Sequence, residues 1–150
     1  AKAHPRRFGE TGFHSGNVQP VHRAAIARHE LGDRLIVEKG ADAVGLAVVR
    51  STPYPWSASQ PLAKAFSAAA SKQKLPIDYD HCLGYINGRV LSEAVRAAGA
   101  NPTPATLAAA LEKLGKLDLG GYALQYGPGR HHGSSFTEIT ILGPKGRYIR

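Results

Sequence analysis

The fold of this chain is constrained most by residues 43–56, AVGLAVVRSTPYPW, a Val-rich apolar run that ends at Arg50 and leads into two prolines. The run is too short for a helix or a membrane span and is typical of a strand covered on both faces, as in a parallel sheet flanked by helices. Pro53 and Pro55 exclude a helix and a central strand, so the chain must leave the sheet there in an extended form.

The exit from this strand carries two aromatic residues, Tyr54 and the only tryptophan, Trp56. In open α/β sheets the ligand crevice lies just beyond the carboxyl ends of the strands, which makes both residues candidates for ligand binding. The same residues could instead be packing residues at the strand exit, because most aromatic side chains are buried. The local pattern leaves both interpretations open.

Residues 59–114 predict three amphipathic helices. Ser59 and Pro61 indicate the start of the first, which runs to about residue 74 and buries Leu62 and Phe66. We expect the next helix to begin near residue 80 and to end at Gly99.

Gly99 is in the position of a left-handed C-terminal cap. Thr103 and Pro104 then predict the cap and first turn of the third helix, which ends before Gly115. Amphipathic helices must cover other elements, so these three predict a layered domain.

The apolar period changes to two after Gly120, which predicts strands at 122–126 and 135–142 joined by the loop GPGRHHG into a hairpin-like ending. Residues 147–150 are a possible last strand after a second turn. With the helices this order indicates an α/β or mixed class.

The first part of the chain has weaker signals. Residues 1–20 have the glycine and proline content of a loop or disordered segment, residues 21–31 predict a short helix, and residues 35–37 predict a strand fragment.

The chain is basic, with a formal net charge of +8 and a pI near 9.9, which raises the possibility of a small nucleic-acid-binding module. Both the first 40 residues and the remainder contribute to the excess of lysine and arginine, so it is spread rather than concentrated in one stripe. A generic basic surface explains this distribution better, and we expect no nucleic-acid partner.

Length and composition indicate one domain of ordinary size, since 150 residues can bury a core. The 43% hydrophobic and 20% charged residues are typical of a soluble globular protein, and no run approaches the roughly 18 apolar residues of a membrane helix. Cys82 is the only cysteine, which fits a reducing compartment and equally a periplasmic protein without disulfides. The first residues of this chain do not resemble a signal peptide.

The histidines do not predict a metal site. His131 and His132 are adjacent and diverge from an extended backbone, while His22 and His29 lack a third ligand at metal spacing. We therefore expect no metal and no cofactor.

Catalytic constellations are also missing from the sequence. His81 and Cys82 are neighbours on a predicted helix, where adjacent side chains diverge by about 100°, so they do not form a proton-sharing pair by themselves. Asp78 and Asp80 fit helix caps better than a general acid and base. An enzyme using His81 and Cys82, or the adjacent histidines at 131–132, is the weakest of the functional alternatives.

Three stretches occur in a characteristic order: KGADAVGLAVVRSTPYPW, then GYINGRVLSEAVRAAGANPTPATLAAALEKL, then DLGGYALQYGPGRHHGSSFTEITILGPKGRYIR. This succession resembles the C-terminal part of the solute-binding proteins of ABC importers, of the leucine/isoleucine/valine-binding type. The resemblance runs from about Lys39 to the end. On this basis residues 39–150 are the C-terminal portion of a leucine-binding-type domain, and residues 1–38 are an unmatched, partly disordered segment.

The resemblance implies a partial type I periplasmic-binding-protein fold, with a strand, helices and a terminal β-hairpin, from a protein whose two α/β lobes close on a solute by hinge motion. It implies that residues 51–56 are a hinge crossover, with the helix pair in one lobe and the terminal strands in the other. Tyr54 and Trp56 would then form an apolar wall for an amino-acid-like ligand.

The same resemblance implies a non-enzymatic, periplasmic role in amino-acid transport, with the membrane permease of an ABC importer as the partner. In the family, the groups that hold the ligand's carboxylate and ammonium lie upstream of the matched region. The chain is therefore expected to be a fragment of a two-lobe protein, incomplete or inactive in binding.

Overall fold

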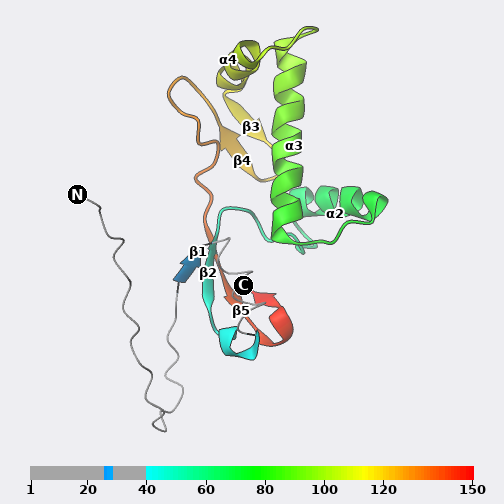
Figure 1. Ribbon diagram of the computed structural model, residues 1–150, viewed down its shortest axis with the longest axis vertical. Helices are drawn as coiled ribbons and strands as arrows, with labels where there is room; N and C mark the ends of the chain where they lie inside the picture. Colours follow the sequence, from blue (N-terminus) through cyan, green and yellow to red (C-terminus); the bar gives the residue numbers. More distant parts are fainter. Residues whose placement is uncertain (1–25, 29–39) are drawn as a thin grey trace, which may run out of the picture.

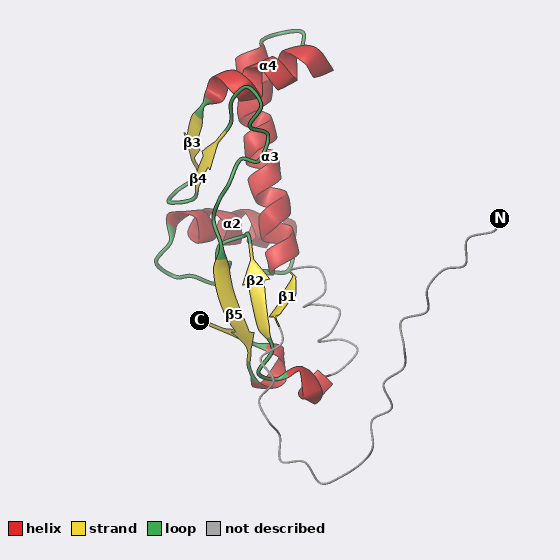
Figure 2. Cartoon of the chain, turned by 90° about the vertical axis from the view of Figure 1, so that its left-hand side faces the viewer, coloured by secondary structure: helices red, strands yellow, loops and turns green. Residues whose placement is uncertain are grey.

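The computed structural model describes residues 26–28 and 40–150, and these form two regions placed end to end along the long axis (Figures 1 and 2). The first region is a four-stranded sheet of β1 (Ile26–Arg28), β2 (Ala47–Arg50), β5 (Glu138–Leu142) and β6 (Tyr148–Ile149), in the order β1-β2-β5-β6. The second, the helical region, contains α2 (Pro61–Gln73), α3 (Tyr79–Ala98), α4 (Pro104–Leu114) and a two-stranded sheet of β3 (Lys116–Asp118) and β4 (Ala123–Gln125).

β2 is the predicted strand, but it is shorter than the apolar run that predicts it. Residues 40–43 form the 3-10 helix η1 (Gly40–Ala43), and Gly45, with φ of 90°, turns the chain into the strand. Val48 and Arg50 are buried, whereas Ala47 and Val49 on the opposite face are half-buried. The expected coverage of both faces is thus met on one face only.

The sheet is mixed rather than parallel. β1 pairs with β2 in parallel, with Ile26 opposite Ala47, and β5 pairs with β2 in the antiparallel sense, with Glu138 opposite Arg50. The helix predicted for residues 21–31 is wrong at 26–28, because ladder hydrogen bonds to the edge of β2 override the weak local helical pattern. The rest of that prediction, the loop predicted for 1–20 and the strand fragment at 35–37 lie outside the described residues.

The three predicted helices are confirmed, with small differences at their ends. α2 is capped by Gln60 rather than Ser59, and the backbone N–H of Gln60 donates to Ser57 Oγ at 3.2 Å. Asp78 caps α3 by accepting from the backbone N–H of His81 at 2.8 Å.

Gly99 follows the last turn of α3, and Thr103 precedes the first turn of α4. Gly99 has φ of 87° but ψ of −161°, so it is not the left-handed helical cap that the sequence suggests. Thr103 forms a capping box with Thr106 at the start of α4, as its position before Pro104 predicts.

The helical region encloses the main apolar core. Leu62 and Phe66 of α2 are buried as predicted and pack against α3 and the β3–β4 sheet. The other buried members of this core are Ala70, Cys82, Ile86, Val90, Leu119, Tyr122 and Leu124. Of the helices that the structure describes, none has the length and apolar character that crossing a bilayer requires.

Gly120 joins the β3–β4 sheet to the start of α2. Its carbonyl accepts from the backbone N–H of Leu62 at 3.1 Å, and a Cβ at this position would lie 3.0 Å from the same nitrogen. Its φ of 87° also lies where side chains are strained, so both the space and the backbone require glycine.

The predicted C-terminal strands exist, but their predicted pairing is wrong. β4 pairs with β3, which the sequence analysis missed, while β5 pairs with β2 and β6. β3 lies close to β4 in the chain, and Asp118 accepts from the backbone N–H of Gly121 at 2.7 Å in the turn between them, so the local hairpin forms there. The terminal hairpin is therefore β5–β6, which turns through the 3-10 helix η2 (Pro144–Gly146).

Two connections run between the regions: residues 51–60 lead from β2 to α2, and residues 126–137 lead from β4 to β5 (Figure 1). The first is the stretch expected to be a crossover. Tyr122 of the helical region donates its hydroxyl hydrogen to the carbonyl of Ser51 at 2.9 Å, which fixes the start of this connection. The terminal strands do not share one region, since β4 belongs to the helical region and β5 and β6 belong to the four-stranded sheet.

Candidate functional site

Four aromatic side chains meet where the four-stranded sheet contacts the start of α3. We call Tyr54, Trp56, Tyr79 and Tyr148, with Arg50 between them, the junction cluster. The ring centroids of Tyr54 and Trp56 are 5.1 Å apart, and Trp56 and Tyr79 are 5.5 Å apart with their planes nearly perpendicular. Tyr79 and Tyr148 are 5.4 Å apart in the same geometry. Edge-to-face contacts at these distances are favourable, so the cluster is a packed unit drawn from three segments of the chain.

Arg50 lies at the centre of this cluster and is fully buried. Its guanidinium carbon is 4.1 Å from the ring centroid of Tyr79 and 4.5 Å from that of Tyr148, which are cation–π distances. The residue directly opposite Arg50 in the antiparallel ladder is Glu138. Arg50 therefore holds a charge at the boundary between the two regions.

Tyr79 is 2% exposed, and its burial raises its pKa to about 12, an effect that the negative charge of Glu138 reinforces and the positive charge of Arg50 opposes. The phenol is consequently neutral at physiological pH. A neutral hydroxyl is suited to packing and hydrogen bonding at the junction and not to proton abstraction.

The two predicted site residues, Tyr54 and Trp56, are both in this cluster but differ in exposure. Tyr54 is half-buried, and its hydroxyl donates to the backbone carbonyl of Tyr148 at 3.3 Å. Trp56 is 42% exposed. Tyr54 thus anchors the crossover, and Trp56 presents an aromatic surface to solvent.

Two adjoining grooves open beside these residues, with volumes of about 640 and 350 Å³. The larger is lined by Tyr54, Pro144, Lys145, Arg147, Tyr148, Ile149 and Arg150. The smaller is lined by Tyr54, Trp56, Gly146, Arg147 and Tyr148. Because three of these residues line both grooves, the aromatic surface of the junction cluster continues into a basic surface.

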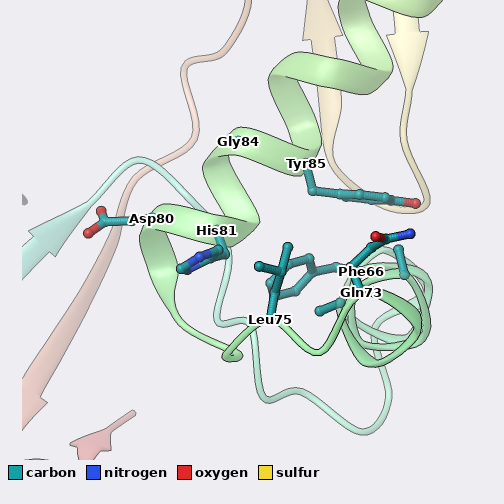
Figure 3. Close-up of a pocket in the computed structure, with 9 residues that line it drawn as sticks. Phe66, Gln73, Leu75, Asp80, His81, Gly84 and Tyr85 are labelled. Atoms are coloured by element: carbon teal, nitrogen blue, oxygen red, sulfur yellow. The ribbon is translucent and has the colours of Figure 1, made fainter.

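A separate, apolar hollow of about 490 Å³ lies between α2 and α3 (Figure 3). Phe66, Leu75 and Tyr85 line it with apolar surface, and Figure 3 shows the side chain of Asp80 directed away from them. His81 at its edge is 2.8 Å from the carboxylate of Asp78 through Nδ1, which fixes the orientation of the imidazole. This hollow has few polar groups, so it offers a solute little orientation.

The residues considered for catalysis are not arranged for it. Cys82 is buried, and burial together with the nearby charge of Asp78 raises its pKa to about 11, so the thiol stays protonated at neutral pH. His131 is exposed, with Nε2 3.4 Å from a carboxylate oxygen of Glu112.

Metal ligands do not cluster in residues 26–28 and 40–150, where no group of three or more His, Cys, Asp or Glu side chains could hold an ion. His22 and His29 lie outside the described residues.

The sequence analysis missed Arg50, Tyr79, Tyr148 and Arg147 as members of the site. The one local signal was at Arg50, a cation that ends an apolar run. If such a cation is buried with the run, its charge requires partners nearby. Tyr79 and Tyr148 come from the start of α3 and from β6, and only the tertiary structure brings them to the same place.

Comparison with proteins of known structure shows where this architecture occurs. The chain is similar to a possible leucine/isoleucine/valine-binding protein from Rhodopirellula baltica, with 29% identity and a TM-score of 0.74 over 83% of this chain. It is also similar to a substrate-binding periplasmic protein from Ralstonia solanacearum, with 25% identity and a TM-score of 0.69 over 83% of the chain. An extracellular ligand-binding receptor from Verminephrobacter eiseniae matches 79% of the chain with 26% identity and a TM-score of 0.66.

This chain covers 35%, 37% and 35% of those three structures, in the same order, and so spans about a third of their length. The fold is a partial periplasmic-binding-protein fold. No curated protein matched the sequence significantly.

The sequence profile described as "Periplasmic binding protein" matches residues 8–140, nearly the whole chain. The match begins well before Lys39, where the resemblance carried by the sequence motifs starts. With the similarity in fold to the solved structures in agreement, this chain belongs to the periplasmic binding protein family.

Proposed function

We propose that this chain provides part of a solute-binding site of an ABC importer, in which Trp56 and Tyr54 form the aromatic wall against the solute. The observation that carries the proposal is the exposed face of Trp56 beside a groove at the junction of two regions that the chain crosses twice. Aromatic side chains suit such a wall because they bury a large area and lose few rotamers on binding.

An amino-acid-like solute is supported by the similarity to the possible leucine/isoleucine/valine-binding protein from Rhodopirellula baltica. In this proposal the protein works in the periplasm and delivers its solute to a membrane permease. It acts by binding and not by catalysis.

The mechanism we propose is a hinge motion at the junction cluster. The connections at 51–60 and 126–137 are the parts of the described chain where a change in backbone angles would rotate the helical region against the sheet. A solute held between the regions favours the closed arrangement by its extra contacts there, and Trp56 would become less exposed.

The test is thermal unfolding of the 150-residue chain with and without L-leucine, L-isoleucine, L-valine and L-phenylalanine, followed by circular dichroism. A ligand that binds only the folded chain raises the unfolding midpoint, because binding contributes RT ln(1 + [L]/Kd) to stability. We expect at least one amino acid to raise it, and Trp56→Ala to abolish the rise.

Leu91→Ala is the matched control, because Leu91 is a large, 56% exposed apolar residue on α3 outside the two grooves. A midpoint that no amino acid moves, or that rises equally in Trp56→Ala, would contradict the proposed site.

A further inference from the structure

We propose that two copies of this chain associate through α3, packed antiparallel, so that Leu91 and Val95 of one copy fill the space over Gly88 and Gly84 of the other. The inference goes beyond the proposed function, because this side of α3 lies outside both grooves beside Trp56. What points to it is an exposed row of two glycines and two large apolar residues along the helix.

The 20-residue helix α3 carries apolar residues on two sides. The buried side belongs to the core of the helical region and consists of Tyr79, Cys82, Ile86, Val90 and Ala94. On the other side, Gly84, Gly88, Leu91 and Val95 are all exposed, and at about 100° per residue they fall within a sector of about 60°. We call these four residues the outer face. Because the core is closed on the buried side, the outer face is available for a further contact.

The outer face combines large side chains with open space. Leu91 and Val95 are 56% and 39% exposed. A Cβ built on Gly84 or on Gly88 would meet no neighbouring atom within 4 Å. Glycine inside a helix is less favourable than alanine, and none of the described residues comes close enough to require its small size here. The approach of a second helix gives both glycines a role.

The spacing of the four residues matches a two-fold axis. When the axis crosses α3 between residues 89 and 90, Gly88 lies level with Leu91 of the second copy, and Gly84 lies level with Val95. A two-fold axis repeats every contact, so each large side chain of the pair meets a glycine of the other copy. Such an alternation of large and small residues lets two helices pack closely.

The charges of α3 lie away from the outer face and are committed elsewhere. Arg89 donates to the hydroxyl of Tyr85 at 3.1 Å, and Glu93 is ion-paired with Arg96. Ser92, at the border of the outer face, donates its hydroxyl hydrogen to a backbone carbonyl one turn earlier at 2.7 Å. Pairing of two outer faces therefore buries apolar surface without burying a charge from residues 84–95.

The outer face continues into the apolar hollow between α2 and α3, because Gly84 belongs to the outer face and also lines the hollow (Figure 3). In the two-fold arrangement, residues 95–99 of the second copy lie level with residues 80–84 of the first. The end of the second copy's helix therefore reaches the edge of the hollow, which extends the contact beyond α3 itself.

The experiment measures the mass of the 150-residue chain by sedimentation equilibrium at concentrations from about 1 to about 200 µM. An interface built on one helix pair is at the small end of protein interfaces, so we expect a monomer–dimer equilibrium with a dissociation constant on the order of 10 µM. Raising the salt concentration should strengthen pairing, because it screens the repulsion between two chains of formal net charge +8.

Leu91→Lys places a charge in the contact and should weaken the dimer by at least about a hundredfold. Ile139→Lys is the matched control, because Ile139 is also a large exposed apolar residue, lies on β5 outside the outer face, and gains the same charge. The Ile139→Lys chain should form dimers like the unaltered chain.

Gly88→Leu separates a specific fit from general adhesion between apolar surfaces. The substitution adds apolar surface but fills the space that Leu91 of the second copy needs, so pairing should weaken by about tenfold. Combining Gly88→Leu with Leu91→Ala exchanges the large and the small position and should restore most of the affinity.

Circular dichroism checks that every variant is folded. A chain that stays monomeric at all these concentrations overturns the proposal. So does a dimer that Ile139→Lys dissociates and Leu91→Lys does not, or one that Gly88→Leu strengthens. Solute binding is independent of this contact, so in Leu91→Ala the rise of the unfolding midpoint with an amino acid should persist.

Discussion

The helical region and the four-stranded sheet differ in how completely each covers its own apolar surface. In the helical region, α2, α3 and the β3–β4 sheet enclose a core whose members Leu62, Phe66 and Ile86 are at most 3% exposed. In the sheet, one face carries Ile139 and Ile141 at 60% and 48% exposure. The helical region is thus closed by its own residues, whereas the described sheet is closed on one face only.

This contrast separates local from non-local stabilisation. Helices that follow one another in the chain pack together in the helical region, whereas the central pair of the sheet, β2 and β5, joins strands that lie far apart in sequence. The two kinds of structure meet at the junction cluster, where Tyr79 at the start of α3 packs on Arg50 and Tyr148 of the sheet.

The largest difference between the regions should appear when a large apolar side chain is removed from each. We expect Phe66→Ala to lower the free energy of unfolding by about 4 kcal/mol, because it leaves a cavity in a closed core. Ile139→Ala, on the exposed face of β5, should cost less than about 1 kcal/mol. Urea denaturation of the 150-residue chain measures both. Equal losses would mean that the exposed face of the sheet is covered in solution.

A second test asks whether the junction between the regions stays closed in the folded chain. Because burial raises the pKa of Tyr79 to about 12, the folded chain holds this proton at pH values where the unfolded chain, with a pKa of about 10, has lost it. The stabilisation is fully present below about pH 10 and falls between about pH 10 and 12, by up to about 3 kcal/mol.

Urea midpoints measured at several pH values from 9 to 12 follow this loss, and Tyr79→Phe serves as the control. The variant lacks the titrating group, so its midpoint should fall less steeply while other groups titrate equally in both proteins. Parallel curves would show that Tyr79 already reaches solvent in the folded chain, and hence that the junction opens.

A smaller effect is expected from Arg50, the charge between the regions. Arg50→Met keeps an unbranched apolar stem but removes the guanidinium from between Tyr79 and Tyr148, which should cost about 2 kcal/mol. Arg50→Lys, which keeps the charge without the planar stack, should recover part of that loss. A more stable Arg50→Met would show that the desolvation of this cation outweighs its contacts.

Much of the helical region could be predicted from the sequence because its determinants are local. The caps at Asp78 and Thr103, the glycine after α4 and the burial of Phe66 each follow from residues within one or two turns. The strand at β2 and its extended exit followed from the apolar run and the two prolines in the same way.

The sheet and most of the junction cluster could not be predicted because they depend on which distant segments meet. The alternating pattern located β4 and β5 but did not reveal that the two strands belong to different sheets. Tyr54 and Trp56 could be singled out as candidates because they sit beside a proline-rich strand exit. Nothing local marked Tyr148 as their neighbour across the junction.

The direct pairing of Arg50 with Glu138 has a consequence for how the chain folds. These residues end one strand and begin its neighbour, so the whole helical region is an insert within what would otherwise be a β-hairpin. If the insert were still unfolded, forming that hairpin would cost the loop-closure entropy of residues 51–137. An insert that has already folded holds its own two ends near each other and reduces that entropy. We therefore expect the helical region to fold first and β2 and β5 to pair afterwards.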